Sequence, residues 1–160
     1  MFKSIKSSSW LRSAPAVVLR RIDRIASTIN MDVSNISIRF KKMPLNVGGA
    51  MLHKEEVSLD FQFFDPSKIN DLEFTLLHEL RHIQQSRRGL LSSMMGGFYW
   101  KQEFHEKIGD SDQYYLTPWE NDANSYAMNL MSDAQLQTIP FVQKIIKVHI
   151  EHGVPFEIAF

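Results

Sequence analysis

The chain of 160 residues contains no cysteine. That absence excludes a disulfide framework and a thiolate metal site, so any bound metal must be held by histidine and carboxylate side chains. The chain also lacks a run of about 18 apolar residues, which a membrane-spanning helix would need. We therefore expect a cytoplasmic protein with no membrane partner.

Glycine and proline are also scarce, with 7 and 6 residues, which excludes a collagen-like chain. Charged residues make up 22% of the chain, a value that is ordinary for a globular protein and does not indicate disorder. A length of 160 residues is enough to bury a core of its own. We predict a single domain over residues 1–160, in which residues 1–12 are a candidate flexible end.

Charge is balanced overall but unevenly distributed. Residues 1–42 hold nine Lys or Arg against two Asp, a net charge of +7, and the remainder holds 9 against 16, a net charge of −7. A basic segment of this kind can bind nucleic acid. It is more often a solvated helix face balanced by the rest of the protein, so nucleic-acid binding through the basic N-terminal third is the less favoured prediction.

The most informative motif is the pentapeptide HELRH, which places H-E-x-x-H at His78, Glu79 and His82. Apolar residues at helical spacing predict a helix around it: Leu76, Leu77, Leu80 and Ile83. Residues four apart on a helix differ by about 40° in rotation and about 6 Å in rise, so the two histidines can share one metal ion. Glu79 lies about 100° further round, where it can reach a water molecule on that ion. The pattern is typical of zincin-type zinc sites, although it also arises by chance.

A third ligand is expected from a second helix that begins near Pro118. Glu120 is the preferred candidate, because a carboxylate is a normal third partner for two histidines at catalytic zinc. Asp122 is the alternative, but two residues on a helix point about 200° apart, so both cannot face the metal. We expect Asp122 to contribute only a helix-dipole effect of about 0.3 to 1 kcal/mol. Without a metal, Glu120 would have the same role.

Further polar residues are candidates for supporting roles. Asn124 stands one turn after Glu120, where it can hydrogen-bond Glu120 or a histidine ring. Peptide hydrolysis also needs a donor that stabilises negative charge on the carbonyl oxygen. The sequence does not choose among the candidate donors, which are His105, Tyr114, Tyr115 and Tyr126.

Two motifs together resemble a known family. HELRH, followed by E-x-x-A-N-x-aromatic-A at residues 120–127, is similar to the small gluzincin-type metallopeptidases, including the ImmA/IrrE-like group. A longer segment is also similar to compact metallopeptidase domains that are often found in phage and prophage genomes. Its sequence is YYLTPWENDANSYA, and the stretch GGFYWKQEFHE precedes it. The resemblance covers roughly residues 47–132. It implies that His78, His82 and Glu120 are metal ligands. It also implies that Glu79 is the catalytic carboxylate. The chain departs from the family at residues 101–103, KQE, where a turn glycine is usual.

Alternating apolar residues predict strands at 36–40 and 57–63, with a short segment at 50–52 between them. We therefore predict an α+β, zincin-like fold, in which a small mixed or antiparallel sheet packs on the active-site helix with further helices. Residues 90–117 are expected to form a long connection beside the cleft, with Met94 and Met95 in the core.

A last helix is predicted from Pro140 to His152, ended by Gly153. Its two histidines, His149 and His152, are three residues apart. Because no third ligand lies near them in the sequence, we expect both to be exposed rather than to bind a metal.

The combined prediction is a metallopeptidase that binds one zinc ion per chain and cleaves a peptide or protein substrate. The alternative is a zinc-stabilised regulatory or binding protein without catalysis. Glu79 argues against that alternative, because a structural zinc site has no use for a carboxylate beside an open coordination position.

Overall fold

The computed structural model describes residues 1–9, 12–44, 48–53, 55–109 and 112–159. Helices and strands are both well represented, which confirms the α+β class. The chain divides into two compact units, residues 1–80 and 81–160. The boundary falls inside helix α2 (Ile69–Arg87). Among the described residues, no helix combines the length and the apolar character that crossing a membrane requires.

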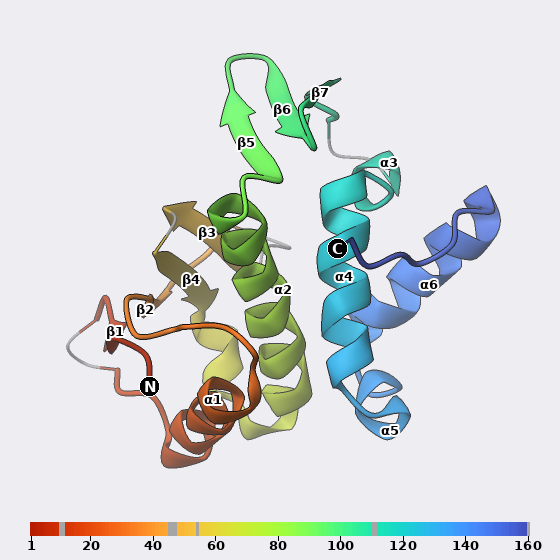
Figure 1. The fold of residues 1–160 in the computed structure, drawn as a ribbon. Coiled ribbons are helices and arrows are strands. Elements are labelled where there is room, and N and C mark those ends of the chain that lie inside the picture. The colour runs from red at the N-terminus through yellow and green to blue at the C-terminus, as the bar shows by residue number, and fades with distance from the viewer. Residues whose placement is uncertain (10–11, 45–47, 54, 110–111, 160) are drawn as a thin grey trace. The chain divides into compact units, whose positions relative to one another are not determined.

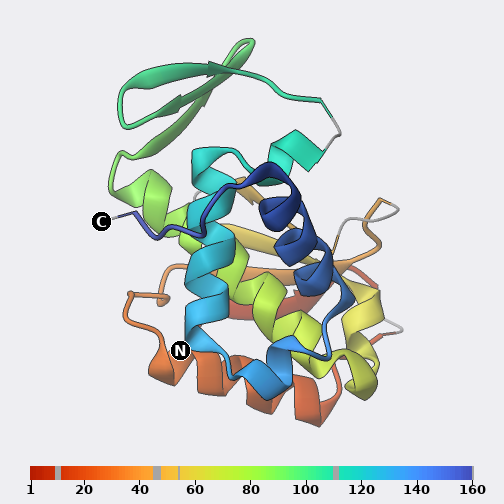
Figure 2. The same cartoon turned by 90° about the vertical axis from the view of Figure 1, so that its right-hand side faces the viewer.

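The first unit is built on a four-stranded mixed sheet (Figure 1). In their order across the sheet, the strands are β1 (Ser4–Ser7), β2 (Ser37–Lys41), β4 (Glu56–Asp60) and β3 (Gly49–His53). β1 and β4 run parallel to β2, whereas β3 is antiparallel to β4. Alternation along β2 buries Ile38 and Phe40 and exposes Arg39. The part of α2 that belongs to this unit lies against one face of the sheet (Figure 2).

Three of these strands fall where the sequence predicts them. The strand expected at 57–63 ends earlier, because the Asp60 side chain accepts the N–H of Gln62 at 2.7 Å and turns the chain into a 3-10 helix, η1 (Phe61–Phe64). β1 lies in the segment 1–12 considered above as a candidate flexible end, and it pairs in register with β2. Its sequence, SIKS, offers too little alternation to predict a strand.

Helices α1 and α2 complete the first unit. α1 (Ala16–Thr28) buries a stripe formed by Val18, Ile22 and Ile25. A second 3-10 helix, η2 (Pro66–Lys68), leads into α2. Across the two helices, Glu73 forms ion pairs with Arg21 and, at 3.1 Å, with Arg24. Part of the basic charge of the N-terminal third is therefore neutralised within the unit.

The second unit contains helices and a small antiparallel sheet. The helices are α3 (Asp112–Tyr115), α4 (Pro118–Leu130), α5 (Asp133–Leu136) and α6 (Pro140–His152). α6 has the predicted bounds, and Gly153 ends it in the left-handed conformation with φ 64°. His149 is buried and stacks on Phe156 with ring centroids 3.9 Å apart, so the prediction that it is exposed was wrong. His152 is exposed, as predicted.

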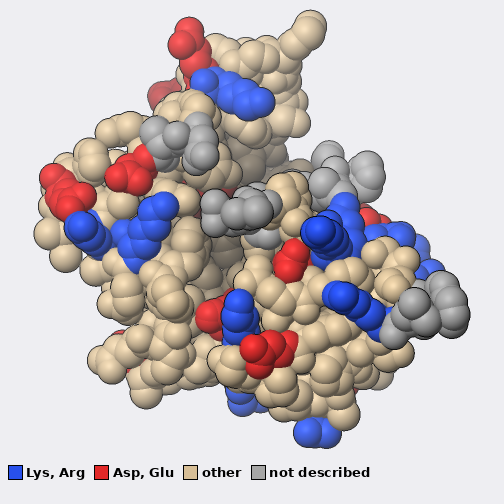
Figure 3. Space-filling model, turned by 180° about the vertical axis from the view of Figure 1, so that it is seen from behind, with Lys and Arg blue, Asp and Glu red and all other residues tan. Residues whose placement is uncertain are grey.

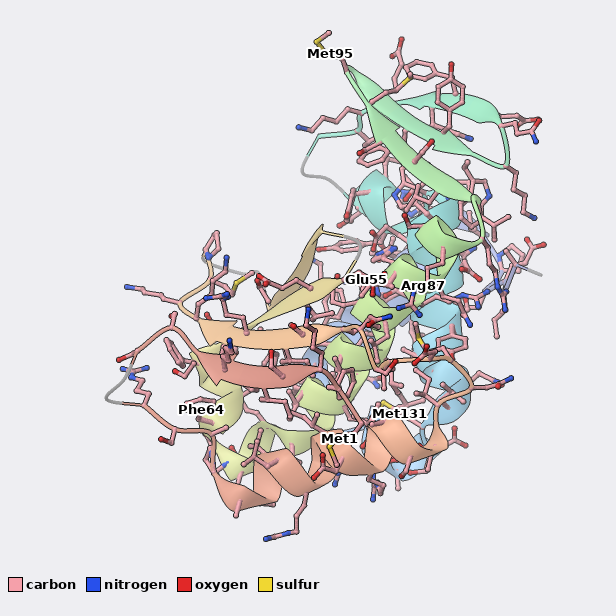
Figure 4. All side chains as sticks on the ribbon, turned by 60° about the vertical axis from the view of Figure 1, so that its left-hand side comes forward. Met1, Glu55, Phe64, Arg87, Met95 and Met131 are labelled. Carbon is pink, nitrogen blue, oxygen red and sulfur yellow. The ribbon has the colours of Figure 1, made fainter. Side chains whose placement is uncertain are left out.

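Residues 91–106 form three paired strands instead of an irregular connection. They are β5 (Leu91–Met94), β6 (Gly97–Trp100) and β7 (Glu103–Glu106), in that order. Met94 and Met95 are 51% and 98% exposed, so their assignment to the core was wrong. Figure 4 shows Met95 at the tip of the turn between β5 and β6, pointing outward. The strands are too short for their alternation to stand out in the sequence.

The turn between β6 and β7 forms without a glycine. Trp100 pairs with Glu103, and the two residues between them, Lys101 and Gln102, have φ of 48° and 72°. Both lie in the left-handed region, which is typical of a type I′ hairpin turn and favours asparagine and glycine. This turn is therefore held in a strained backbone conformation, at a cost of about 1 kcal/mol per residue.

We predict that Gln102→Gly increases the free energy of unfolding by about 1 kcal/mol, because glycine adopts the left-handed conformation without that cost. The urea midpoint of unfolding measures the change. Gln137→Gly is the matched control, since Gln137 is exposed with an ordinary φ of −62°. Equal midpoints for the two variants would contradict the prediction.

Candidate metal centre

Helix α2 carries the H-E-x-x-H motif in its middle, as the sequence predicts. Its apolar side chains at 76, 77, 80 and 83 are all buried, which fixes the rotation of the helix. His82 is 8% exposed and His78 is half-buried, one turn earlier. Both histidines therefore occupy one face of a well-anchored helix.

Glu120 belongs to the first turn of α4, which begins at Pro118. The side chain is almost fully buried, with 4% of its surface exposed. Its Oε1 atom lies 3.0 Å from Nε2 of His82. Tyr114 donates its hydroxyl hydrogen to the same oxygen at 2.8 Å, which fixes the direction of the carboxylate.

The three predicted ligands come together. One ligand atom from each of His78, His82 and Glu120 lies within 4.8 Å of the other two. Ligands at 2.0 to 2.2 Å around tetrahedral zinc are about 3.3 Å from one another, so the 3.0 Å contact between His82 and Glu120 already has nearly that spacing. Two imidazoles and one carboxylate also match the donor set of catalytic zinc sites with an open fourth position. The residues present fit a zinc ion.

Gln85 fixes the ring of His82, and this role was not predicted from the sequence. Its Oε1 accepts a hydrogen bond from Nδ1 of His82 at 2.8 Å, and its Nε2 donates to the Trp119 carbonyl at 2.9 Å and to Asp122 at 2.6 Å. Because both of these partners are acceptors, they must face the NH₂ group of the Gln85 amide, which leaves its oxygen facing His82. An amide oxygen only accepts, so Nδ1 carries a proton, and Nε2 is the ring nitrogen that faces Glu120 and can bind a metal. The available signal was its position three residues after His82.

Asp122 has a different role from the one the sequence suggests. It is 1% exposed and forms a two-pronged ion pair with Arg81, at 2.8 Å from Nε and 2.9 Å from Nη2. Arg81 is itself 4% exposed and also donates to Gln84. The predicted helix-dipole role was therefore wrong, because the side chain that points away from the metal meets a buried guanidinium instead of solvent.

Of the supporting candidates, Tyr114 contacts a proposed ligand. Its hydroxyl is engaged with Glu120, so it orients the carboxylate. Asn124 is fully buried on α4, one turn after Glu120.

The other three candidates make contacts of a different kind. Tyr115 packs edge-on against an aromatic ring of α6, with centroids 5.6 Å apart. The guanidinium of Arg81 lies 4.8 Å from the ring centroid of Tyr126, and burial raises the pKa of the Tyr126 phenol. His105 packs against Trp119 at 5.4 Å. None of these contacts selects a donor for the carbonyl oxygen.

Glu79 is buried to 7% exposure on α2, and strand β3 passes close to it. A Cβ atom added at Gly49 would lie 2.7 Å from Cγ2 of Thr75 and 3.3 Å from Cγ of Glu79. A glycine is therefore required for the strand to lie this close to the helix. The backbone of β3 thus borders the predicted catalytic carboxylate.

Comparison of the chain with protein-family models, with curated proteins and with solved structures found no match. The interpretation of the site consequently depends on its own residues and their geometry. The strongest of these observations is the grouping of two histidines and a buried glutamate, His78, His82 and Glu120.

Proposed function

We propose that the chain is a zincin-type metallopeptidase that binds one zinc ion through His78, His82 and Glu120. The observation that carries the proposal is the approach of their three ligand atoms to within 4.8 Å of one another. A sheet that leads into the H-E-x-x-H helix, followed by a later helix that supplies a glutamate, also agrees with the zincin plan and with the resemblance to gluzincins.

Zinc held there would lower the pKa of a water molecule and polarise the carbonyl group of the bond to be cleaved. Glu79 would serve as the general base, which takes a proton from water and passes it to the leaving nitrogen. Gln85 holds the imidazole of His82, and Tyr114 holds the carboxylate of Glu120. Such outer hydrogen bonds keep ligands in the geometry that the chemistry requires.

A peptide substrate is supported by the sheet of the first unit. β3 stands at the end of the strand order β1-β2-β4-β3, and Gly49 of this strand lies against Glu79. A strand at a sheet edge offers backbone N–H and C=O groups that an extended peptide can pair with. Pairing along β3 would carry the peptide past the proposed general base.

Nucleic-acid binding remains the less favoured alternative. Arg21 and Arg24 are engaged with Glu73, and Arg39 lies 3.4 Å from Glu56. On the face shown in Figure 3, acidic side chains lie among the basic ones. A mixed surface of this kind gives a weaker positive field than the charge count of residues 1–42 suggests.

We predict about one zinc ion per chain in wild-type protein, and a large loss of zinc in His78→Ala, because two ligands hold the ion far less tightly than three. Elemental analysis after chelation, reloading with zinc and desalting measures the content. His152→Ala is the control, since this histidine is exposed on α6. Failure of the wild-type protein to take up zinc would overturn the proposed function.

A further inference from the structure

The segment that follows α6, residues 154–159, runs alongside α4 (Figure 2). Side chains of α4 bind its backbone at three successive places. Asn121 donates to the Pro155 carbonyl at 3.0 Å, and the N–H of Glu157 donates to Asn121 and to Ser125, both at 3.1 Å. The N–H of Ala159 then donates to Oδ1 of Asp122 at 2.7 Å.

The same segment is anchored on α6. Nδ1 of His149 is 2.9 Å from the Val154 carbonyl, and the His149 ring stacks on Phe156. At the other end, Arg81 donates to the Ala159 carbonyl at 2.6 Å. The segment is therefore bound along its length to two helices and to the residue that precedes His82.

A continuous chain of hydrogen bonds connects this segment to a proposed metal ligand. Ala159 donates to Asp122, Asp122 accepts from Gln85, and Gln85 accepts from His82, at 2.7, 2.6 and 2.8 Å. Gln85 and Asp122 are each 1% exposed. Because water cannot easily replace a partner lost at this depth, a change at Ala159 must be absorbed by the remaining members of the chain.

The carboxylate of Asp122 accepts four hydrogen bonds, two from Arg81 and one each from Gln85 and the Ala159 N–H. Arg81 in turn uses the Ala159 carbonyl as an acceptor. Ala159 thus serves both members of the buried ion pair. Removal of Ala159 takes one hydrogen-bond partner from Oδ1 of Asp122 and one from Nη2 of Arg81.

We propose that residues 154–159 are an integral part of the metal site. In this proposal Asp122 and Gln85 are positioning residues, through which the segment fixes the orientation of the His82 ring. The proposal rests on the proposed function, because it takes His82 to be a zinc ligand. A segment that only covered the core would stabilise the fold without changing the affinity for zinc.

The test uses backbone substitutions that remove single N–H groups. Ala159→Pro removes the donor to Asp122, whereas Ala159→Ser retains it. Asp133→Pro is the proline control, since Asp133 is exposed at the first position of α5, where a helix tolerates proline, and lies outside the segment. Zinc Kd is measured by competition with a chelating indicator, and the melting temperature of the zinc-free protein reports the fold.

We expect zinc affinity to fall about 10- to 100-fold in Ala159→Pro, the usual effect of losing an outer partner of a ligand, to be restored in Ala159→Ser, and to be unchanged in Asp133→Pro. Gln85→Leu should show the same loss, and combining it with Ala159→Pro should add little, since both break one chain. This variant also tests the coupling if the proline variant does not fold.

A second readout does not need zinc. Proton NMR of the zinc-free protein detects the Nδ1–H of His82 that Gln85 accepts, and its exchange with water measures how firmly the ring is held. We expect slow exchange in wild type and faster exchange in Ala159→Pro. Unchanged affinity and unchanged exchange of the ring N–H in that variant, with wild type binding zinc normally, would overturn this proposal and leave the proposed function standing. A wild type that binds no zinc would instead overturn the proposed function.

Discussion

Glu79→Gln should retain zinc and the fold while lowering kcat/KM for peptide cleavage by about 10²- to 10⁴-fold, the usual contribution of a general base. The amide has nearly the shape of the carboxylate, so the buried side chain still fits against β3. It cannot take a proton from water at neutral pH. Cleavage of a peptide library, followed by mass spectrometry, measures the loss, and elemental analysis verifies the zinc content.

Asp71→Asn is the matched control, because Asp71 lies in the first turn of the same helix, two turns before Glu79. This variant should cleave at the wild-type rate. If Glu79→Gln cleaves as fast as wild type, Glu79 is not the base. If wild type binds zinc but cleaves no member of the library, the zinc-stabilised binding protein becomes the better interpretation of the same site.

The proposed ligands were predictable because their relation is mostly local. Helical spacing alone places His78 and His82 on one face, and a carboxylate near the start of a second helix is a natural third partner. Glu120 was preferred to Asp122 by the length of its side chain and by the resemblance, and it is Glu120 whose oxygen lies 3.0 Å from His82. These arguments need no knowledge of how distant segments pack.

The surroundings of the ligands were not predictable, because they depend on contacts between distant parts of the sequence. Arg81 meets Asp122 across 41 positions and Ala159 across 78. In the sequence, Arg81 is one of the two variable residues of H-E-x-x-H, and nothing local shows that it is buried. Gln85 likewise gains its role only when α4 supplies the Trp119 carbonyl and Asp122.

The strands of the second unit were missed for a different reason. β5 contains two serines and an exposed methionine, so its residues do not alternate between apolar and polar. Antiparallel pairing and two tight turns stabilise these short strands, and the second turn uses Lys101 and Gln102 in a conformation that sequence rules reserve for glycine or asparagine. Pairing between strands has overridden local preference here.

Asp122→Ala should lower the free energy of unfolding by about 3 to 5 kcal/mol, several times the effect of a helix-dipole residue, because it leaves the buried charge of Arg81 without its partner. The Gln85 amide and the Ala159 N–H lose an acceptor in the same step. Urea unfolding should be followed with a chelator present, so that bound metal does not contribute to the measured stability.

Asp133→Ala provides the comparison, since Asp133 is an exposed acid in the first turn of α5 and should cost at most about 1 kcal/mol. Replacing both charges, in Arg81→Met with Asp122→Leu, should recover much of the stability lost in Asp122→Ala, because an apolar pair avoids the cost of an unpaired buried charge. The double variant should still bind zinc more weakly than wild type, since Gln85 then lacks the carboxylate that orients it. A loss in Asp122→Ala no larger than that in Asp133→Ala would show that the ion pair does not stabilise the second unit.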